Sequence, residues 1–360
     1  MAGAAARPAH GLGLTAALAE RTRANAEFFA AEAERLARLC DEMAVRFLAG
    51  GRLLASGTGG AARSDAHHVA VEFVHPVIVG KRALPALAVE NLAAEAEPGD
   101  IVIAFDGDAS VARERGCLMI EGFAPPSADA LVRQELMETL YHVLWELVHV
   151  FIEHRERRGH DAGASSFLYP FLGAGQQSLE SVTEDVRRSV LDKARETAAL
   201  REQTLTENAE ALAGAADALR RSGRVLALGN GGSATDAMDV VADLRARGRR
   251  ALDLTADSAV LTAIANDIGV EAIFARQVIA YGRADDALLT LSTSGNSENA
   301  IAALREARRR GMATIALVGY GGGRIAAESL ADFVVVTRSE HIPRIQEAQA
   351  SAYHVLVEAL

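Results

Sequence analysis

One glycine-rich stretch decides the fold of this chain: Leu228-Gly229-Asn230-Gly231-Gly232-Ser233-Ala234-Thr235-Asp236-Ala237. It follows the apolar run Val225–Leu228, which predicts a short buried strand, and it leads into helical apolar spacing over 237–244. A strand, a glycine turn and a helix start present several backbone N–H groups at one point, where the helix dipole adds positive charge. The stretch therefore predicts an anion site, although a glycine-rich turn can also serve only to reverse the chain.

A second stretch of the same kind follows another predicted strand, Leu288–Leu291. The chain there reads Ser292-Thr293-Ser294-Gly295-Asn296-Ser297 and continues into a helical pattern over 300–310. Capping a helix needs one hydroxyl, and this stretch offers four. The surplus of hydroxyl groups favours a second phosphate-binding loop over a simple helix cap.

These stretches resemble the sugar isomerase (SIS) domain, and within it the phosphoheptose isomerases. The resemblance covers about residues 185–360 and adds two further motifs, Leu261–Asp267 and Arg344–Glu347 with His354. It implies a site for a seven-carbon sugar phosphate. The implied binding residues are Asn230, Gly231, Gly232, Ser233, Asn266, Asp267, Ser292, Thr293, Ser294, Ser297, Gln346 and His354.

Composition narrows the class of protein. The chain has 360 residues, enough for two domains, and its formal net charge of −11 argues against nucleic acid as a partner. The sequence predicts no membrane span, and Met1–His10 does not read as a secretory signal. Two cysteines, Cys40 and Cys117, form neither a disulfide framework nor a zinc cluster, so we expect a cytoplasmic protein.

The two halves of the sequence repeat the same spacings. Each half has an aspartate followed by histidine or acidic side chains three and seven positions later. Each half then has a glutamine followed by a histidine eight positions later. The matched sets are Asp65, His68, Glu72, Gln134 and His142 in the first half, and Asp236, Asp239, Asp243, Gln346 and His354 in the second. The sequence therefore predicts an internal duplication.

The first copy is shorter and lacks the phosphate-binding residues. Asp65 and Gln134 are 69 residues apart, whereas Asp236 and Gln346 are 110 apart, and Asn266-Asp267 has no counterpart. The stretch 105–110, Phe-Asp-Gly-Asp-Ala-Ser, stands where the serine-rich stretch is expected. Since carboxylates repel phosphate, the first half is predicted to be a poor phosphate site.

The first half keeps the residues that can hold a metal. His68 and Glu72 are four apart and share a helix face, while Gln134 and His142, eight apart, project from similar directions of a second helix. Imidazole, carboxylate and amide oxygen suit zinc. In phosphoheptose isomerases the residues at these four positions hold zinc, and the glutamate and second histidine also transfer protons. The alternative for His68 and Glu72 is a surface ion pair.

In the second half Asp239 and Asp243 stand where the family has histidine and glutamate. Aspartate can bind a metal through oxygen, but the nitrogen ligand is lost and the side chain is shorter. These residues put independent catalysis by the second half in doubt. They could equally be solvated carboxylates on a helix face.

The expected fold is α/β, with two tandem SIS-type domains, each a parallel sheet flanked by helices in three layers, and with the first copy truncated. The expected domains are residues 1–154 and 179–360, joined by a linker at 155–178. We expect SIS domains to pair, as an internal pseudo-dimer and as a homodimer.

The expected function is aldose–ketose isomerisation of a sugar phosphate, most plausibly sedoheptulose 7-phosphate, with Glu72 as base, His142 as acid and a zinc-like cofactor. The first half lacks the phosphate-binding residues, and the second half lacks the family's histidine and glutamate. These complementary losses suggest that metal residues of one half act with the phosphate loops of the other half or of a partner chain. The competing hypothesis is a non-catalytic sugar-phosphate-binding protein, a sensor or a protein adaptor.

Overall fold

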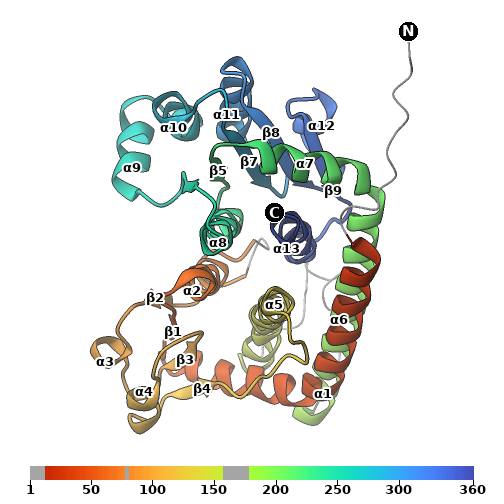
Figure 1. The fold of residues 1–360 in the computed structure, drawn as a ribbon. Helices are drawn as coiled ribbons and strands as arrows, with labels where there is room; N and C mark the ends of the chain where they lie inside the picture. Colours follow the sequence, from red (N-terminus) through yellow and green to blue (C-terminus); the bar gives the residue numbers. More distant parts are fainter. Residues whose placement is uncertain (1–12, 78–80, 157–177) are drawn as a thin grey trace. The chain divides into compact units, whose positions relative to one another are not determined.

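The computed structural model describes residues 13–77, 81–156 and 178–360 (Figure 1). The chain divides into two compact units. The N-terminal unit is Thr22–Ala198, and the C-terminal unit is Ala199–Leu360 together with the described residues up to Arg21. Most of the expected linker, 155–178, lies outside the described residues.

The N-terminal unit contains a parallel sheet of four strands in the order β2-β1-β3-β4. Its strands are β1 (Leu53–Ser56), β2 (Ala86–Val89), β3 (Ile101–Ala104) and β4 (Leu118–Ile120). Its helices are α2 (Gly60–Val74), α3 (Leu92–Glu95), α4 (Ser110–Glu114), α5 (Ala130–Arg155) and most of α1 (Leu14–Leu48) and α6 (Leu179–Glu207).

The C-terminal unit contains a parallel sheet of five strands in the order β6-β5-β7-β8-β9. Its strands are β5 (Val225–Leu228), β6 (Ala251–Asp253), β7 (Ala287–Ser292), β8 (Ala313–Gly319) and β9 (Phe333–Thr337). Its helical elements are α7 (Ala209–Arg221), α8 (Gly232–Ala246), α9 (Ser258–Asp267), η2 (Val270–Ala272), α10 (Ile273–Tyr281), α11 (Glu298–Arg309), α12 (Gly323–Ala327) and α13 (Ile342–Glu358).

The strand orders confirm the predicted α/β fold of two parallel sheets flanked by helices. The first four strands of each unit are arranged in the same order, and β1 and β5 each lead into a helix, α2 or α8. Among the described residues, the N-terminal unit has only the short α3 where the C-terminal unit has α9, η2 and α10, and it has no counterpart of β9. The truncation of the first copy therefore removes elements at the rim and leaves the central strands in place.

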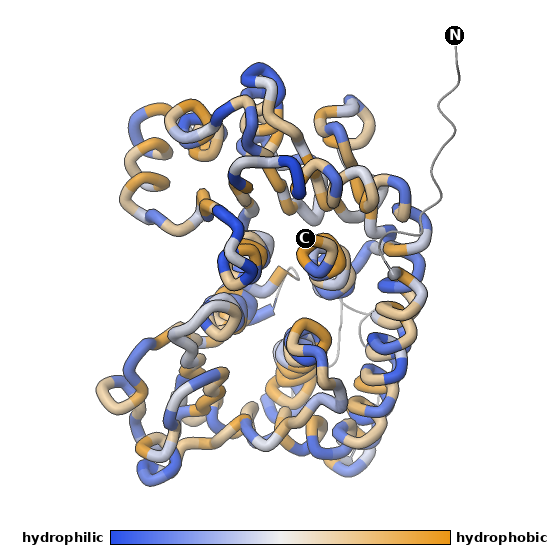
Figure 2. Tube along the Cα trace, in the orientation of Figure 1, coloured by the Kyte–Doolittle hydropathy of each residue, from blue (hydrophilic) through white to orange (hydrophobic). Residues whose placement is uncertain are grey.

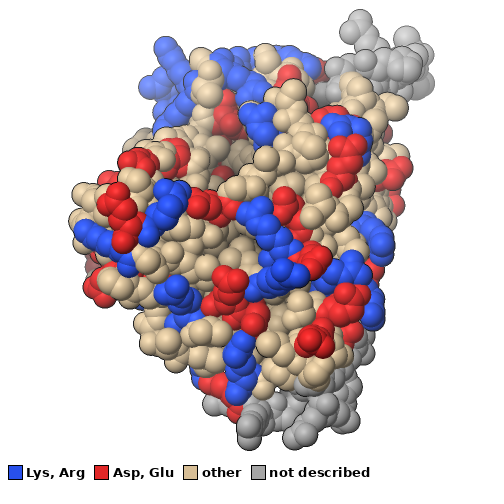
Figure 3. All heavy atoms as spheres, turned by 90° about the horizontal axis from the view of Figure 1, so that it is seen from below, with Lys and Arg blue, Asp and Glu red and all other residues tan. Residues whose placement is uncertain are grey.

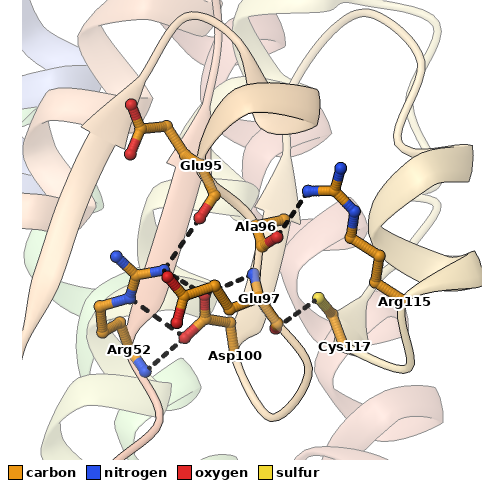
Figure 4. A network of polar contacts seen from close by, with 7 residues as sticks. All are labelled: Arg52, Glu95, Ala96, Glu97, Asp100, Arg115 and Cys117. Carbon is orange, nitrogen blue, oxygen red and sulfur yellow. Dashed lines mark hydrogen bonds and ion pairs between the residues drawn. The ribbon is translucent and has the colours of Figure 1, made fainter.

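An ion pair at the start of the central strands also repeats. Arg52, just before β1, binds Asp100, just before β3, through Nη2 and Oδ2 at 2.7 Å and through the backbone N–H and Oδ1 at 2.9 Å (Figure 4). Arg224, just before β5, binds Asp286, just before β7, at 2.7 Å. Both aspartates are buried, so each pair is well shielded from solvent. Sequence analysis missed this repeat, which fixes the neighbouring strand starts in both units.

One long helix in each unit is buried along most of its length. Figure 2 shows α5 as a largely hydrophobic helix, and most residues of both α5 and α13 are buried, including Trp145 and Tyr353. A helix that is apolar on most sides packs inside a core. The polar side chains on these helices are therefore held in dry surroundings, and they include the candidate site residues Gln346, His142 and His354.

Charged side chains of both signs are interspersed on the surface. On the face in Figure 3, basic and acidic groups alternate over an otherwise uncharged surface, and neither sign forms a large continuous field. None of the helices among the described residues combines the length and the hydropathy needed to span a bilayer.

Candidate functional site

The glycine-rich stretch forms the strand, turn and helix start that its sequence predicts. β5 ends at Leu228 and α8 begins at Gly232. A Cβ atom on Gly229 would lie 2.0 Å from the backbone oxygen of Ser233, so only glycine fits beside the first turn of α8. Gly231 has a φ of +57°, the left-handed conformation that glycine adopts at little cost. We call residues 229–232 the glycine turn.

The serine-rich stretch, residues 292–297, forms a compact loop between β7 and α11, here called the serine loop. The Ser292 hydroxyl accepts a hydrogen bond from the Gly295 N–H at 3.2 Å and lies 3.5 Å from the Ser297 hydroxyl. Gly295 has a φ of +62°, and a Cβ there would lie 2.2 Å from the backbone oxygen of Gly322. Ser297 is the N-cap of α11, yet its hydroxyl makes no capping bond. The loop thus directs hydroxyls towards a helix start without using all of them as caps.

A pair of hydrogen-bonded side-chain amides joins the glycine turn to the first turn of α11, next to the serine loop. Asn230 Nδ2 donates to Asn299 Oδ1 at 3.0 Å, and Asn299 Nδ2 donates back to Asn230 Oδ1 at 2.9 Å. Asn299, in the first turn of α11, was not predicted as a site residue. The only feature of the sequence that could have pointed to Asn299 as a site residue is that this amide side chain comes two positions after Ser297, the last serine of the loop. The pair therefore holds the glycine turn against the first turn of α11, directly after the serine loop.

Asn266 and Asp267 lie at the carboxyl end of α9, and both are exposed. Asn266 Nδ2 donates to Asp267 Oδ1 at 2.7 Å. Within the described part of the chain, no hydrogen bond joins either residue to the glycine turn or the serine loop. Their proposed contact with a sugar stays a prediction.

Three acidic and imidazole groups converge further along α8, and we call Asp239, Asp243 and His354 the carboxylate cluster. His354 Nε2, on α13, lies 3.4 Å from Asp239 Oδ2 and 3.6 Å from Asp243 Oδ2. Tyr353 Oη donates to Asp239 Oδ2 at 2.9 Å. Asp239 is 2% exposed and Asp243 9%, so the alternative of solvated carboxylates on a helix face is wrong.

Burial and charge repulsion shape the carboxylate cluster. The pKa of Asp243 is raised to about 6, mainly by loss of hydration and next by the charge of the neighbouring Asp239, while His354 and Arg247 oppose the shift. The cluster therefore gathers negative charge in a dry place. Gln346, a predicted binding residue, lies buried on α13 two turns before His354.

In the N-terminal unit, α2 and α5 bring His68 and His142 together. Their Nε2 atoms are 3.3 Å apart, and Glu72 Oε1 lies 3.8 Å from His68 Nε2. All three side chains are at most 3% exposed, so the alternative of a surface ion pair is wrong. Gln134, the fourth predicted ligand, lies half-buried near the start of α5, eight residues before His142.

Glu138 belongs to the same group and was not predicted. One ligand-type atom from each of His68, Glu138 and His142 lies within 4.8 Å of the other two. The signal in the sequence is its position midway between Gln134 and His142, which places all three on one face of α5. We call His68, Glu72, Glu138 and His142 the imidazole cluster.

The imidazole cluster fits a zinc ion. Burial, and then the proximity of His142, lower the pKa of His68 well below its usual value, so His68 is neutral, the form that binds metals. Zinc binds imidazole nitrogen at about 2.0–2.1 Å, which places two nitrogens of a tetrahedral site roughly 3.3–3.4 Å apart. The two Nε2 atoms are 3.3 Å apart. Burial also raises the pKa of Glu72 to about 7, with His142 lowering it and Glu146 raising it.

A carboxylate occupies the anion position of the N-terminal unit. Asp106 follows β3, as the serine loop follows β7, and its Oδ2 accepts from the backbone N–H groups of Thr58 at 3.1 Å and Gly59 at 2.9 Å. These donors lie at the start of α2, in the turn that corresponds to the glycine turn. The sequence predicted a poor phosphate site here because carboxylates repel phosphate. The structure adds that one of them takes the hydrogen bonds a phosphate would use.

Comparison with known proteins agrees with this geometry. Residues 192–319 match the SIS domain. A phosphoheptose isomerase from Roseiflexus sp. is 37% identical over 190 residues, which cover 50% of this chain and 95% of that protein. One from Nitratidesulfovibrio vulgaris is 38% identical over 187 residues, which cover 49% and 89%. The chain belongs to the phosphoheptose isomerase family of SIS-domain proteins.

The family likeness in sequence covers about half of the chain, whereas a likeness in fold covers nearly all of it. The C-terminal domain of glucosamine-fructose-6-phosphate aminotransferase from Francisella tularensis superposes with a TM-score of 0.58 at 10% identity. The match covers 96% of this chain and 94% of that structure. At this identity the likeness shows the fold alone, and it extends over both units.

Proposed function

We propose that the protein is an aldose–ketose isomerase of sugar phosphates that acts on sedoheptulose 7-phosphate. One observation carries the proposal: the Asn230–Asn299 amide pair holds the glycine turn, at the start of α8, against the first turn of α11, which the serine loop leads into. The named activity of the relatives that match in sequence supports the choice of substrate.

The C-terminal unit provides the phosphate contacts in this proposal. Backbone N–H groups at the starts of α8 and α11 and the hydroxyls of Ser292, Thr293, Ser294 and Ser297 are the donors. The protein carries a formal net charge of −11, so these local dipoles, and not the overall field, must attract the phosphate.

We assign the acid–base groups to the N-terminal unit, of this chain or of a partner chain. We assign a zinc-like ion to His68, Glu72, Gln134 and His142, with Glu138 as a further carboxylate ligand. When bound, the ion would polarise a sugar carbonyl. Glu72 takes the proton from the carbon beside the carbonyl and later returns it to the former carbonyl carbon. His142 gives a proton to the carbonyl oxygen and then accepts the proton of the neighbouring hydroxyl, which becomes the new carbonyl. Both side chains are fully enclosed, which keeps water from competing for the proton.

The test is turnover of sedoheptulose 7-phosphate by the purified full chain, before and after treatment with a chelator. We expect isomerisation that is lost with the metal and restored by zinc. The His68→Ala, His142→Ala double variant should lose both zinc and activity. The His67→Ala variant is the matched control, because His67 is the exposed neighbour of His68 on α2. Equal zinc content in the double variant and the parent would refute the assigned site.

A second candidate is a sugar-phosphate-binding protein without turnover. Asp106 in the anion position of the N-terminal unit favours it, as do Asp239 and Asp243 at the family's histidine and glutamate positions. Tight binding of sedoheptulose 7-phosphate by the zinc-loaded protein, without isomerisation, would establish this candidate and contradict the first.

A further inference from the structure

We propose that an arginine-rich edge of the C-terminal unit binds the phosphodiester backbone of single-stranded nucleic acid. The edge consists of the residues that lead into β6, β5, β7 and β8, and we call it the arginine strip. Its residues are 247–250, 220–224, 282–286 and 308–312. The proposal is independent of the isomerase function, because the glycine turn and the serine loop follow their strands, whereas the strip precedes its strands.

The strand order makes the strip continuous. All strands of this sheet are parallel, so the segments that precede them lie at one edge. Three hydrogen bonds to backbone carbonyls join neighbouring segments: Arg249 to Ser222, Gly223 to Asp285, and Arg310 to Gly282. Neighbouring strands lie about 4.8 Å apart, so the strip extends over roughly 14 Å across its four strands.

The strip carries a large excess of positive charge. Its four segments contain ten arginines and two aspartates, and one of these aspartates belongs to the buried pair Arg224–Asp286. Among the residues that the structure describes, no carboxylate pairs with the exposed side chains of Arg221, Arg250 or Arg283. These three guanidinium groups are therefore available to an anion from outside the chain.

The N-terminal unit shows that the fold does not require this charge. The residues just before its four strands, 49–52, 81–85, 97–100 and 115–117, contain four basic and two acidic side chains. Ion pairs with carboxylates of the same unit hold three of the four basic groups. The arginine–aspartate pair before the central strands is common to both units, and it does not account for the excess of arginine in the C-terminal unit.

The choice of partner follows from the kind and the spacing of the charges. Guanidinium groups bind phosphate oxygens through two parallel N–H donors. Consecutive phosphates of one strand lie about 3.4 Å apart, so a strip of roughly 14 Å faces about four of them. Tyr281, directly before the segment 282–286, is 42% exposed, and the bases of single strands stack on such rings. The strip itself exposes no large apolar side chain, which disfavours a membrane surface.

The negative net charge of the whole chain does not oppose this binding. The formal net charge of −11 led to the expectation that nucleic acid is not a partner. Charges separated by more than about 10 Å are largely screened at 0.1 M salt, so an anion at the strip interacts mainly with the strip. The local distribution of charge, and not its sum over the chain, therefore decides which partner this edge attracts.

The experiment measures binding of a fluorescein-labelled single-stranded oligothymidylate of about 20 nucleotides to the full chain by fluorescence anisotropy. Between about 50 and 200 mM salt, the logarithm of the affinity should fall with the logarithm of the salt concentration at a slope of about −3, as about four phosphate contacts imply. The triple variant Arg221→Gln, Arg250→Gln, Arg283→Gln should bind about tenfold more weakly, with a slope flatter by about 2. Tyr281→Ala should weaken binding by about 5- to 150-fold and leave the slope unchanged.

A control variant removes the same charge elsewhere in the unit. Arg305→Gln, Arg324→Gln, Arg338→Gln changes three arginines outside the strip that pair with glutamates, and it should keep the slope of the parent. Circular dichroism confirms that each variant is folded. Equal losses in the two triple variants would overturn the proposal, and so would a parent that does not bind the oligothymidylate at about 50 mM salt. Binding of poly-glutamate in place of the oligothymidylate would also overturn it, and would assign the strip to an acidic protein.

Discussion

The two units share the order of their central strands and differ at two corresponding places, the helix start after the first strand and the buried cluster of titratable side chains. In both, an arginine–aspartate pair ties the starts of the central strands, Arg52 with Asp100 and Arg224 with Asp286. In the N-terminal unit, the backbone N–H groups at the start of α2 bind the Asp106 carboxylate. In the C-terminal unit, the corresponding start of α8 lies beside the start of α11, which the serine loop precedes.

The difference shows how a duplicated site can diverge without loss of the fold. The backbone N–H groups at the start of α2 still need an acceptor, and Asp106 supplies one from within the chain. The buried clusters also differ: the N-terminal unit has the imidazole cluster, whereas the C-terminal unit has the carboxylate cluster. The framework pairs stand before β3 and β7, whereas Asp106 and the serine loop follow these strands, so binding residues could be exchanged at one end of the sheet while the strand order was kept.

The largest predicted effect concerns the acid–base role of the N-terminal unit. Glu72→Gln keeps the size of the side chain but removes the proton acceptor, so isomerisation should fall by roughly 10²–10⁴. Phosphate affinity should be nearly unchanged, because the proposed phosphate contacts belong to the C-terminal unit and not to Glu72. Steady-state kinetics and calorimetry measure the two quantities separately. Glu42→Gln, an exposed change on α1, is the control. Full activity in Glu72→Gln would remove the proposed contrast between the units.

An intermediate effect is expected at the serine loop. Ser294→Ala and Ser297→Ala should each weaken sugar-phosphate binding by about 1–3 kcal/mol, because each loses a hydrogen bond to a charged oxygen. Titration calorimetry with sedoheptulose 7-phosphate measures the change. Ser110→Ala is the matched control in the N-terminal unit, where the hydroxyl donates to Asp108 at 2.8 Å. An equal loss in Ser110→Ala would mean that both units bind phosphate.

The smallest effect is expected at Asp106. Asp106→Ala removes the acceptor of the Thr58 and Gly59 N–H groups, so the free energy of unfolding should fall by about 1 kcal/mol, as for a lost helix cap. The same change should let inorganic phosphate bind weakly at this turn, which ³¹P line broadening would detect. Asp108→Ala removes a comparable acceptor, that of Ser110, without freeing the Thr58 and Gly59 N–H groups, so it should not create phosphate binding. A parent that already binds phosphate at this turn would contradict the substitute role of Asp106.

Part of this protein could be derived from its sequence because the deciding interactions are local. The turn from β5 into α8 depends on Gly229 and Gly231, whose conformations follow from neighbours in the chain. Helical spacing places His68 and Glu72 on one face, and the repeated spacings reveal the duplication. Hydrophobic runs that end in polar loops predicted the strands at 225–228 and 288–291, and the resemblance to SIS domains implied a parallel sheet in each half.

Tertiary packing decided which side chains meet, since those contacts join segments far apart in the chain. The approach of α2 to α5 brings His68 within 3.3 Å of His142 and adds Glu138, and the Asn230–Asn299 pair links two loops that the sequence treats separately. Asp106 reads as a repelling charge in the sequence and becomes a hydrogen-bond acceptor only when β3 lies beside β1. The burial of Asp239 and Asp243 likewise depends on packing, because helical spacing fixes which residues share a face and not what covers that face.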